Sequence, residues 1–233
     1  MQSTWRITAA GVILCLVSIM GFGIRLWCRE NAFAERLFVL REVCNWAVRG
    51  EDFIAFPRRV YFDDAGIPLV GWRTQLVAEC LPTHEHFQSG SRWDSNDYRE
   101  IRKRGEGWMS RPNETGPLIM AIAGKGTVFE DGHEIMPDDV PPDCILFVEV
   151  LRYDIHWAEP RDIDVETLDG VNGNSIPDYV GSELGAGFHI AFRDGEVWFV
   201  SRKTPASLLA KFASRFHDGA RNRWKEFTEF RIR

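Results

Sequence analysis

Hydrophobic and polar positions divide the chain into an uncharged N-terminal run, a short helical pattern and a long mixed region. Residues 7–24 contain no charged side chain. As an α-helix this run would measure about 27 Å, close to the thickness of the hydrocarbon core of a bilayer. Trp5 and Trp27 flank the run, as aromatic residues do at membrane interfaces. The pattern predicts a transmembrane anchor within residues 1–27, with the lipid bilayer as the partner of residues 7–24.

A cleaved signal peptide is the alternative interpretation of this run. The apolar part of a signal peptide is usually shorter and precedes a small-residue cleavage site, whereas residues 25–29 (RLWCR) are bulky and charged. We therefore favour an uncleaved signal anchor. Counting Arg6 against Arg25 and Arg29 slightly favours the C-terminal side of the run as the cytoplasmic one.

Beyond the run, apolar residues recur at alternating spacings of four and three, which places them on one stripe of a helix. The stripe consists of Phe33, Leu37, Leu40, Cys44 and Ala47. Gly50 is suited to end this helix. We expect a helical extension over residues 28–50, continuous with the anchor, that packs against a domain formed by residues 51–233.

The domain region alternates between strand-like and helix-like patterns, which predicts an α+β fold class. Residues 58–62 and 67–70 are expected to form a hairpin, and residues 117–123 and 144–151 are apolar runs of strand length. Residues 72–87 could form a helix that breaks or ends near Pro82.

The C-terminal third carries the clearest local signals. Two β-rich runs between residues 189 and 200 meet at Asp194 and Gly195, the pair favoured in two-residue type I′ hairpin turns. Thr204 and Pro205 are expected to open a helix, with Thr204 as N-cap. Its predicted buried face consists of Leu208, Leu209, Phe212 and Phe216.

The net charge of −6 argues against nucleic acid as the main partner. Residues 126–186 hold fifteen acidic and two basic side chains, and residues 202–233 hold nine basic and three acidic ones. We expect these two regions to be solvated faces that partly neutralise each other across the fold.

The five cysteines form neither a disulfide framework nor a zinc pattern. Cys15 and Cys28 lie in or beside the apolar run, so only Cys44, Cys80 and Cys144 belong to the soluble part. Buried single thiols are the default expectation. One disulfide among these three is compatible with a domain outside the cytoplasm.

Two segments contain residue types that bind metals. Residues 169–178 (DGVNGNSIPD) could supply oxygen ligands to calcium from Asp169, Asn172, Asn174 and Asp178. Only two of these are charged and their spacing fits no standard calcium loop, so a plain surface turn is the favoured alternative. His84 and His86 would share a face on a strand but not on a helix, and a solvated helix end is favoured for them.

A series of short motifs runs along nearly the whole chain. The motifs are Ala55-Phe56-Pro57, Gly71-Trp72-Arg73, Trp93-Asp94-Ser95, residues 145–150 (ILFVEV) followed by residues 157–162 (WAEPRD), and residues 191–195 (AFRDG) with Val197 and Phe199. In this order and at about this spacing they resemble a planctomycete family of secreted pilin-like proteins, catalogued as a domain of unknown function.

The resemblance implies a fold similar to that of type II secretion pseudopilins, in which a long N-terminal helix packs on a small antiparallel sheet. It also implies a single-pass membrane protein of the cell envelope, with its domain on the extracytoplasmic side and other pilin-like subunits as partners. It implies no activity, because none is established for the family. The family-matching candidates for a binding site are Trp93, Asp94, Trp157, Glu159 and Asp162.

The chain departs from the family at three places. Residues 1–6 lack the prepilin-peptidase junction, so we expect the anchor to stay attached and the chain to be a monomer or small complex. The cysteines that typical members place after the anchor and in a Cys-Pro-Ser motif are replaced here by residues 34–36 (AER) and 109–112 (MSRP). Residues 185–188 (GAGF) replace the usual His-Pro-Gly-Gly.

These observations favour a membrane-anchored, pilin-like structural or assembly protein without catalytic activity or a required cofactor. The alternative is a membrane-displayed ligand- or calcium-binding module, and an enzyme is the third hypothesis. Glu159 and Asp162 could act as an acid–base pair, but a structural clamp is favoured. An exposed apolar stripe at Phe33, Leu37 and Leu40 would favour assembly, and a pocket holding Trp93 and Trp157 would favour ligand binding.

Overall fold

The computed structural model describes residues 34, 37–43, 56–79, 90–111, 114–170, 175–216 and 221–232. Residues 39–233 form one compact unit and residues 1–38 form another. The first described helical segment covers residues 37–43. Leu40 and Val43, at its end within the larger unit, are buried.

A two-stranded hairpin opens the continuous part of the larger unit. Strand β1 (Val60–Phe62) pairs antiparallel with β2 (Pro68–Gly71). The carboxylate of Asp63 accepts the N–H groups of Ala65 and Ile67 at 2.9 and 2.7 Å, and Gly66 adopts a φ of +78°. The turn chemistry that the sequence predicts for residues 63–66 therefore holds this hairpin together.

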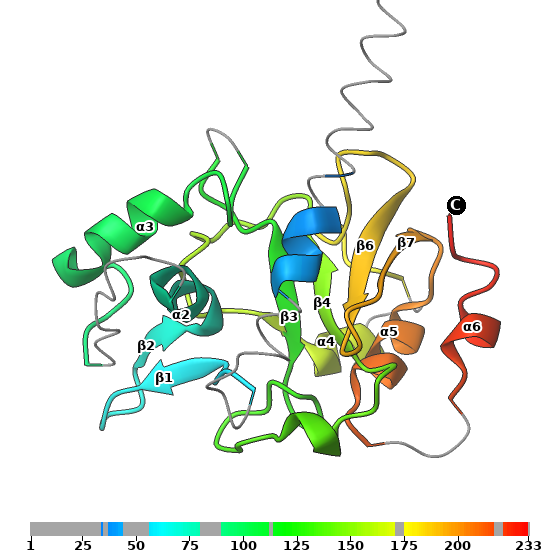
Figure 1. Ribbon diagram of the computed structural model, residues 1–233, viewed down its shortest axis with the longest axis horizontal. Helices are drawn as coiled ribbons and strands as arrows, with labels where there is room; N and C mark the ends of the chain where they lie inside the picture. Colours follow the sequence, from blue (N-terminus) through cyan, green and yellow to red (C-terminus); the bar gives the residue numbers. More distant parts are fainter. Residues whose placement is uncertain are drawn as a thin grey trace, which may run out of the picture. The chain divides into compact units, whose positions relative to one another are not determined.

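The main sheet has five strands in the order β5-β3-β4-β6-β7, and Figure 1 labels β3, β4, β6 and β7. The strands are β3 (Ile119–Ala123), β4 (Ile145–Glu149), β5 (Ile163–Asp164), β6 (Gly187–Phe192) and β7 (Val197–Ser201). Neighbours are antiparallel except β5, which runs parallel to β3. Every residue of β3, β4 and β6 is buried, which explains why their sequences are continuous apolar runs rather than alternating ones.

Helices cover both faces of this sheet. On one face, α5 (Ala206–Ala213) places Leu209 and Phe212 in the same core cluster as Val148 and Ile190, and α4 (Val165–Gly170) contacts α5. On the other face, Trp72 at the start of α2 (Trp72–Glu79) packs on Phe147, with ring centres 4.8 Å apart. Successive residues of a strand point to opposite faces, so β4 contributes buried side chains to both faces of the sheet.

The described part of the chain also contains two 3₁₀-helices and two further short α-helices. They are η1 (Asn96–Tyr98), α3 (Arg99–Gly105), η2 (Pro137–Asp139) and α6 (Arg223–Glu226). Phe227, directly after α6, is fully buried in the cluster beneath α5.

The β6–β7 hairpin is present as predicted, but its loop is one residue longer. The Phe192 N–H donates to the Glu196 carbonyl at 2.9 Å, and the Gly195 N–H donates to the Phe192 carbonyl at 3.0 Å. The loop therefore contains Arg193, Asp194 and Gly195, and Gly195 supplies the required positive φ, at +84°.

Helix α5 begins one residue later than predicted and ends earlier. The Thr204 hydroxyl donates to the Ser201 carbonyl rather than capping the helix, and Pro205 is the N-cap. The helix ends at Ala213, so Phe216 lies beyond it and is 62% exposed. The predicted buried face is therefore wrong at Phe216.

The predicted pseudopilin-like fold class is contradicted. Within the described ranges no helix exceeds eight residues, and the sheet is mixed rather than antiparallel. The apolar stripe predicts which side of a helix is buried but does not fix the length of that helix. Strand β5 contains two residues, too few to show a period in the sequence.

None of the helices in the described part of the chain has both the length and the apolar composition needed to cross a bilayer. This finding contradicts the predicted single-pass membrane protein, its signal anchor and its placement on the extracytoplasmic side of the cell envelope. An uncharged run meets the length requirement for a span, but it does not by itself establish a spanning helix. Residues 7–24 lie outside the described ranges, as do the predicted peptidase junction and most of the extension over residues 28–50.

Candidate functional site

The family-matching residues meet around a buried carboxylate. Asp162 precedes β5 directly, and its side chain has no solvent exposure. Its Oδ1 accepts the Arg73 Nη1–H at 2.6 Å and the Ala121 backbone N–H at 3.1 Å. The Trp72 indole N–H lies 3.1 and 3.2 Å from the two carboxylate oxygens. Asp162 thereby joins the start of α2 to the middle of β3.

Arg73 uses its remaining donors on the loop that precedes Asp162. Its Nε–H donates to the Trp157 carbonyl at 2.7 Å, and its Nη2 donates to the carbonyls of Glu159 and Arg161 at 2.7 and 2.8 Å. The Arg73 side chain is 2% exposed. A buried ion pair of this kind is stable only when such additional hydrogen bonds satisfy it, and here four acceptors surround one guanidinium.

Trp157 fills the space between this loop and α3. Its side chain is fully buried, and a Cβ atom built on Gly105 would lie 2.1 Å from the Trp157 ring. Gly105 is therefore required where α3 passes the indole, since any side chain would overlap it.

The other family-matching residues lie at the edge of this arrangement. Glu159 pairs with its neighbour Arg161 at 2.5 Å. Trp93 is half-buried and stacks on His156, with ring centres 5.3 Å apart. Asp94 is exposed and pairs with Arg92 at 3.0 Å. The structure thus brings Trp157, Glu159 and Asp162 together around Arg73, places Trp93 against the same loop, and leaves Asp94 at the surface.

His156, the partner of the Trp93 ring, is a half-buried titratable group. Burial lowers its pKa below the ordinary value of 6.5, and the positive charge of Arg102 lowers it further. Its Nδ1 accepts the Ala158 N–H at 3.1 Å. The ring is therefore held as a neutral acceptor that shapes the loop.

A second buried polar pair was missed at the sequence level. Glu149 at the end of β4 accepts both the backbone N–H of His189 at 3.1 Å and its Nδ1 at 2.7 Å, and both side chains are at most 1% exposed. The signal that could have indicated this pair is the presence of polar residues inside two otherwise apolar strand runs.

The predicted calcium loop lies largely outside the described residues. Asn172, Asn174 and the side chain of Asp169 are among those not described, and Asp178 is fully exposed with its Oδ1 3.7 Å from the Arg202 guanidinium. Within the described ranges no three His, Cys, Asp or Glu side chains are grouped to hold a metal ion. The prediction for residues 169–178 therefore stays a prediction, and His84 and His86 also lie outside the described part.

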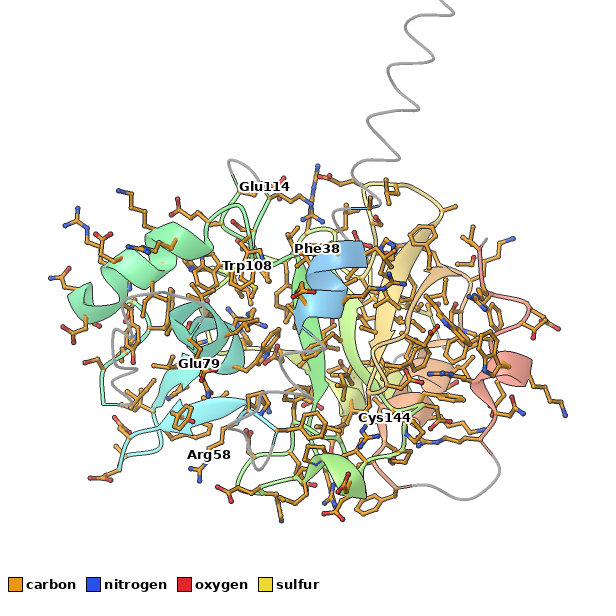
Figure 2. All side chains as sticks on the ribbon, in the orientation of Figure 1. Phe38, Arg58, Glu79, Trp108, Glu114 and Cys144 are labelled. Carbon is orange, nitrogen blue, oxygen red and sulfur yellow. The ribbon has the colours of Figure 1, made fainter. Side chains whose placement is uncertain are left out.

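Cys144 is a free, buried thiol at the start of β4 (Figure 2). Its Sγ lies 3.4 Å from the carbonyl of Ala213, the last residue of α5. Burial raises the pKa of this thiol to about 12. Cys44 and Cys80, the other cysteines considered for a disulfide, are not among the described residues.

Ion pairs join the acidic middle of the chain to its basic C-terminal part. Arg215 contacts Glu130 at 3.1 Å, and Arg221 contacts Asp143 at 3.3 Å. Arg202 lies 3.7 Å from Asp178. The two regions neutralise each other across the fold in the way that their charge pattern predicts.

A hollow of about 280 Å³ lies between β1 and residues 128–135, with the ion pairs of Arg58 with Glu134 and of Arg59 with Asp131 at its rim. None of the five binding-site candidates Trp93, Asp94, Trp157, Glu159 and Asp162 lines this hollow, although Phe56 and Pro57 of the first motif do.

Comparisons with family models, with curated proteins and with solved structures found no match to this chain.

Proposed function

We propose that this chain is a non-catalytic structural or assembly protein, related to the pilin-like family that its motifs resemble. One observation carries the proposal: the buried carboxylate of Asp162 is occupied by hydrogen bonds from Trp72, Arg73 and Ala121. The polar residues that define the resemblance therefore serve to hold α2, β3 and the 157–161 loop in one arrangement.

Acid–base catalysis requires a side chain within hydrogen-bond reach of a substrate proton. The Asp162 side chain has no exposed surface, and its oxygens already accept hydrogen bonds from fixed N–H donors. Glu159, its predicted catalytic partner, is held by the guanidinium of Arg161. This arrangement supports the structural clamp over the acid–base pair.

The described part of the predicted apolar stripe gives the assembly role little support. Leu40 is 1% exposed and Leu37 is half-buried, while Phe33 is not described. Leu37 and Leu40, the stripe residues that the structure describes, therefore offer little apolar area for assembly.

The test compares Asp162→Asn and Glu159→Gln in the full-length chain. Sedimentation velocity over a concentration series should show self-association of the parent protein that Glu159→Gln leaves unchanged. Asp162→Asn should lower the melting temperature and reduce association only in proportion to the fraction unfolded. The absence of any concentration-dependent association in the parent protein would refute the assembly role.

A panel of ester, glycoside and phosphoester probes tests the non-catalytic part of the proposal. We expect no turnover above the buffer rate. Turnover that disappears in Glu159→Gln while the melting temperature stays the same would assign this loop a catalytic role instead.

A further inference from the structure

Three segments that are far apart in the sequence converge on a second hollow of about 280 Å³. It is lined by Pro142, Asp143, Asp194 and residues 221–224, and we name it the Trp224 hollow. The Asp194 N–H donates to the Pro142 carbonyl at 3.1 Å, and the Arg193 N–H donates to the Cys144 carbonyl at 2.8 Å. Two of the three segments are therefore fixed to each other by backbone hydrogen bonds.

The charges in the Trp224 hollow cancel. Arg221 pairs with Asp143 at 3.3 Å, and Arg223 pairs with Asp194 at 2.5 Å. Two guanidinium groups thus face two carboxylates. An anionic ligand would have to displace or approach these carboxylates, so the hollow is suited to a neutral ligand.

Each arginine–aspartate pair presents N–H donors beside carboxylate acceptors. A hydroxyl group both donates and accepts hydrogen bonds, so adjacent hydroxyls can satisfy the two kinds of group together. The Asp143 and Asp194 side chains are 16% and 26% exposed and remain reachable from solvent. The Arg221 side chain is 1% exposed, and neither its Nε nor the Arg223 Nη1 has a hydrogen-bond partner in the described part of the chain.

Both of these nitrogens are shielded from solvent. A buried donor left without an acceptor destabilises a protein, so a ligand hydroxyl that reached either nitrogen would supply the acceptor that it lacks.

An aromatic side chain, Trp224, lines the same hollow. The Trp224 side chain is 55% exposed, although it packs against Trp198 with ring centres 4.6 Å apart. The guanidinium of Arg231 lies 5.0 Å from the Trp224 ring centre and supports the indole further. A large aromatic ring that is both fixed and exposed is typical of a contact surface.

We propose that the Trp224 hollow binds a neutral saccharide. The C–H face of a pyranose ring packs on the Trp224 indole, and its hydroxyls hydrogen-bond to Asp143, Asp194 and Arg223. Neutral charge, paired donors and acceptors, and an exposed indole are the three properties that this class of ligand requires together. The inference stands independently of the assembly role proposed above.

The test is isothermal titration of the full-length chain with four neutral oligosaccharides: cellotetraose, maltotetraose, mannotetraose and the tetramer of N-acetylglucosamine. We expect at least one to bind, and Trp224→Ala and Asp194→Asn each to weaken that binding by about tenfold or more. Asp194→Asn retains the side-chain oxygen that accepts the Glu196 N–H in the hairpin turn, so this variant should fold.

Phe216→Ala is the matched control, because Phe216 is an aromatic residue that is 62% exposed and lies outside the hollow. It should leave the affinity unchanged. Three results would each overturn the proposal: no binding of any of the four sugars, equal binding by Trp224→Ala, or tighter binding of inorganic phosphate or heparin than of any neutral sugar.

Discussion

Substitution of Asp162 by alanine tests the clamp directly. The change removes the carboxylate that pairs with Arg73 and leaves a guanidinium that is 2% exposed without its counter-ion. Removing one partner of a buried ion pair is destabilising by about 3–5 kcal/mol. The indole N–H of Trp72 and the backbone N–H of Ala121 also lose their acceptor, at about 1 kcal/mol or more each.

Because these contributions overlap, we expect Asp162→Ala to lower the free energy of unfolding by about 5 kcal/mol. Native domains have a total stability of about 5–15 kcal/mol, so the variant should be marginally folded or unfolded. Asp162→Asn keeps a neutral acceptor of the same size and should lose about half as much.

Equilibrium urea unfolding of the full-length chain measures the effect. With a slope of about 2 kcal/mol per molar urea, Asp162→Asn should move the midpoint down by about 1 M. The matched control is Glu159→Gln, which removes a more exposed pair with Arg161 and should change stability by no more than about 1 kcal/mol. Two results would show that Asp162 does not act as a clamp. One is a decrease in the free energy of unfolding below about 1 kcal/mol for Asp162→Ala, and the other is an equal decrease for Asp162→Asn and Glu159→Gln.

Four further predictions concern other parts of the domain. Gly195→Val forces a β-branched residue to a φ of +84° and should lower stability by about 1–2 kcal/mol; an unchanged melting temperature would contradict the hairpin geometry. Millimolar calcium should leave the melting curve unmoved if residues 169–178 form a plain turn, whereas bound ligand must raise it by mass action. Cys144, whose pKa burial raises to about 12, should react with a disulfide reagent at neutral pH no faster than the protein unfolds; because other cysteines react too, cysteine-by-cysteine mass mapping provides the readout. The hydrogen bond from the Gly126 N–H, and after it the hydrogen bond from Arg215, lowers the pKa of Glu130 below 4.5. The stability that ionised Glu130 contributes is therefore complete above pH 4.5 and is lost as the pH falls through the lowered pKa. Glu130→Gln should flatten the acid side of the plot of stability against pH.

Local patterns predicted the elements that depend on near neighbours. The β1–β2 and β6–β7 hairpins and α5 follow from turn residues and from apolar runs within about a dozen positions. The exact loop of the second hairpin did not follow, because Asp194 and Gly195 occur in both two-residue and three-residue loops. The hydrogen bond from Phe192 to Glu196 decides between them.

Long-range relations could not be read from the pattern. A structural clamp was predicted for Glu159 and Asp162, but nothing local indicates that Arg73, 89 residues before Asp162, is the partner. The same holds for β5, whose place beside β3 is fixed by two residue pairs only. The predictions of a long helix and of a membrane span were wrong. A hydrophobic pattern indicates which residues are buried, but it does not determine how long a helix is or whether a helix forms.

The clamp has a consequence for the motions of the 157–161 loop, which has no regular secondary structure. Its carbonyls accept hydrogen bonds from Arg73, and its own amides are bonded as well, the Trp157 N–H to the Thr115 carbonyl at 2.6 Å and the Arg161 N–H to the Glu159 carbonyl at 2.8 Å. Opening the loop would break the contacts that join α2 to β3. Its amide hydrogens should therefore exchange with solvent as slowly as those of the central strands, and only when the whole domain unfolds.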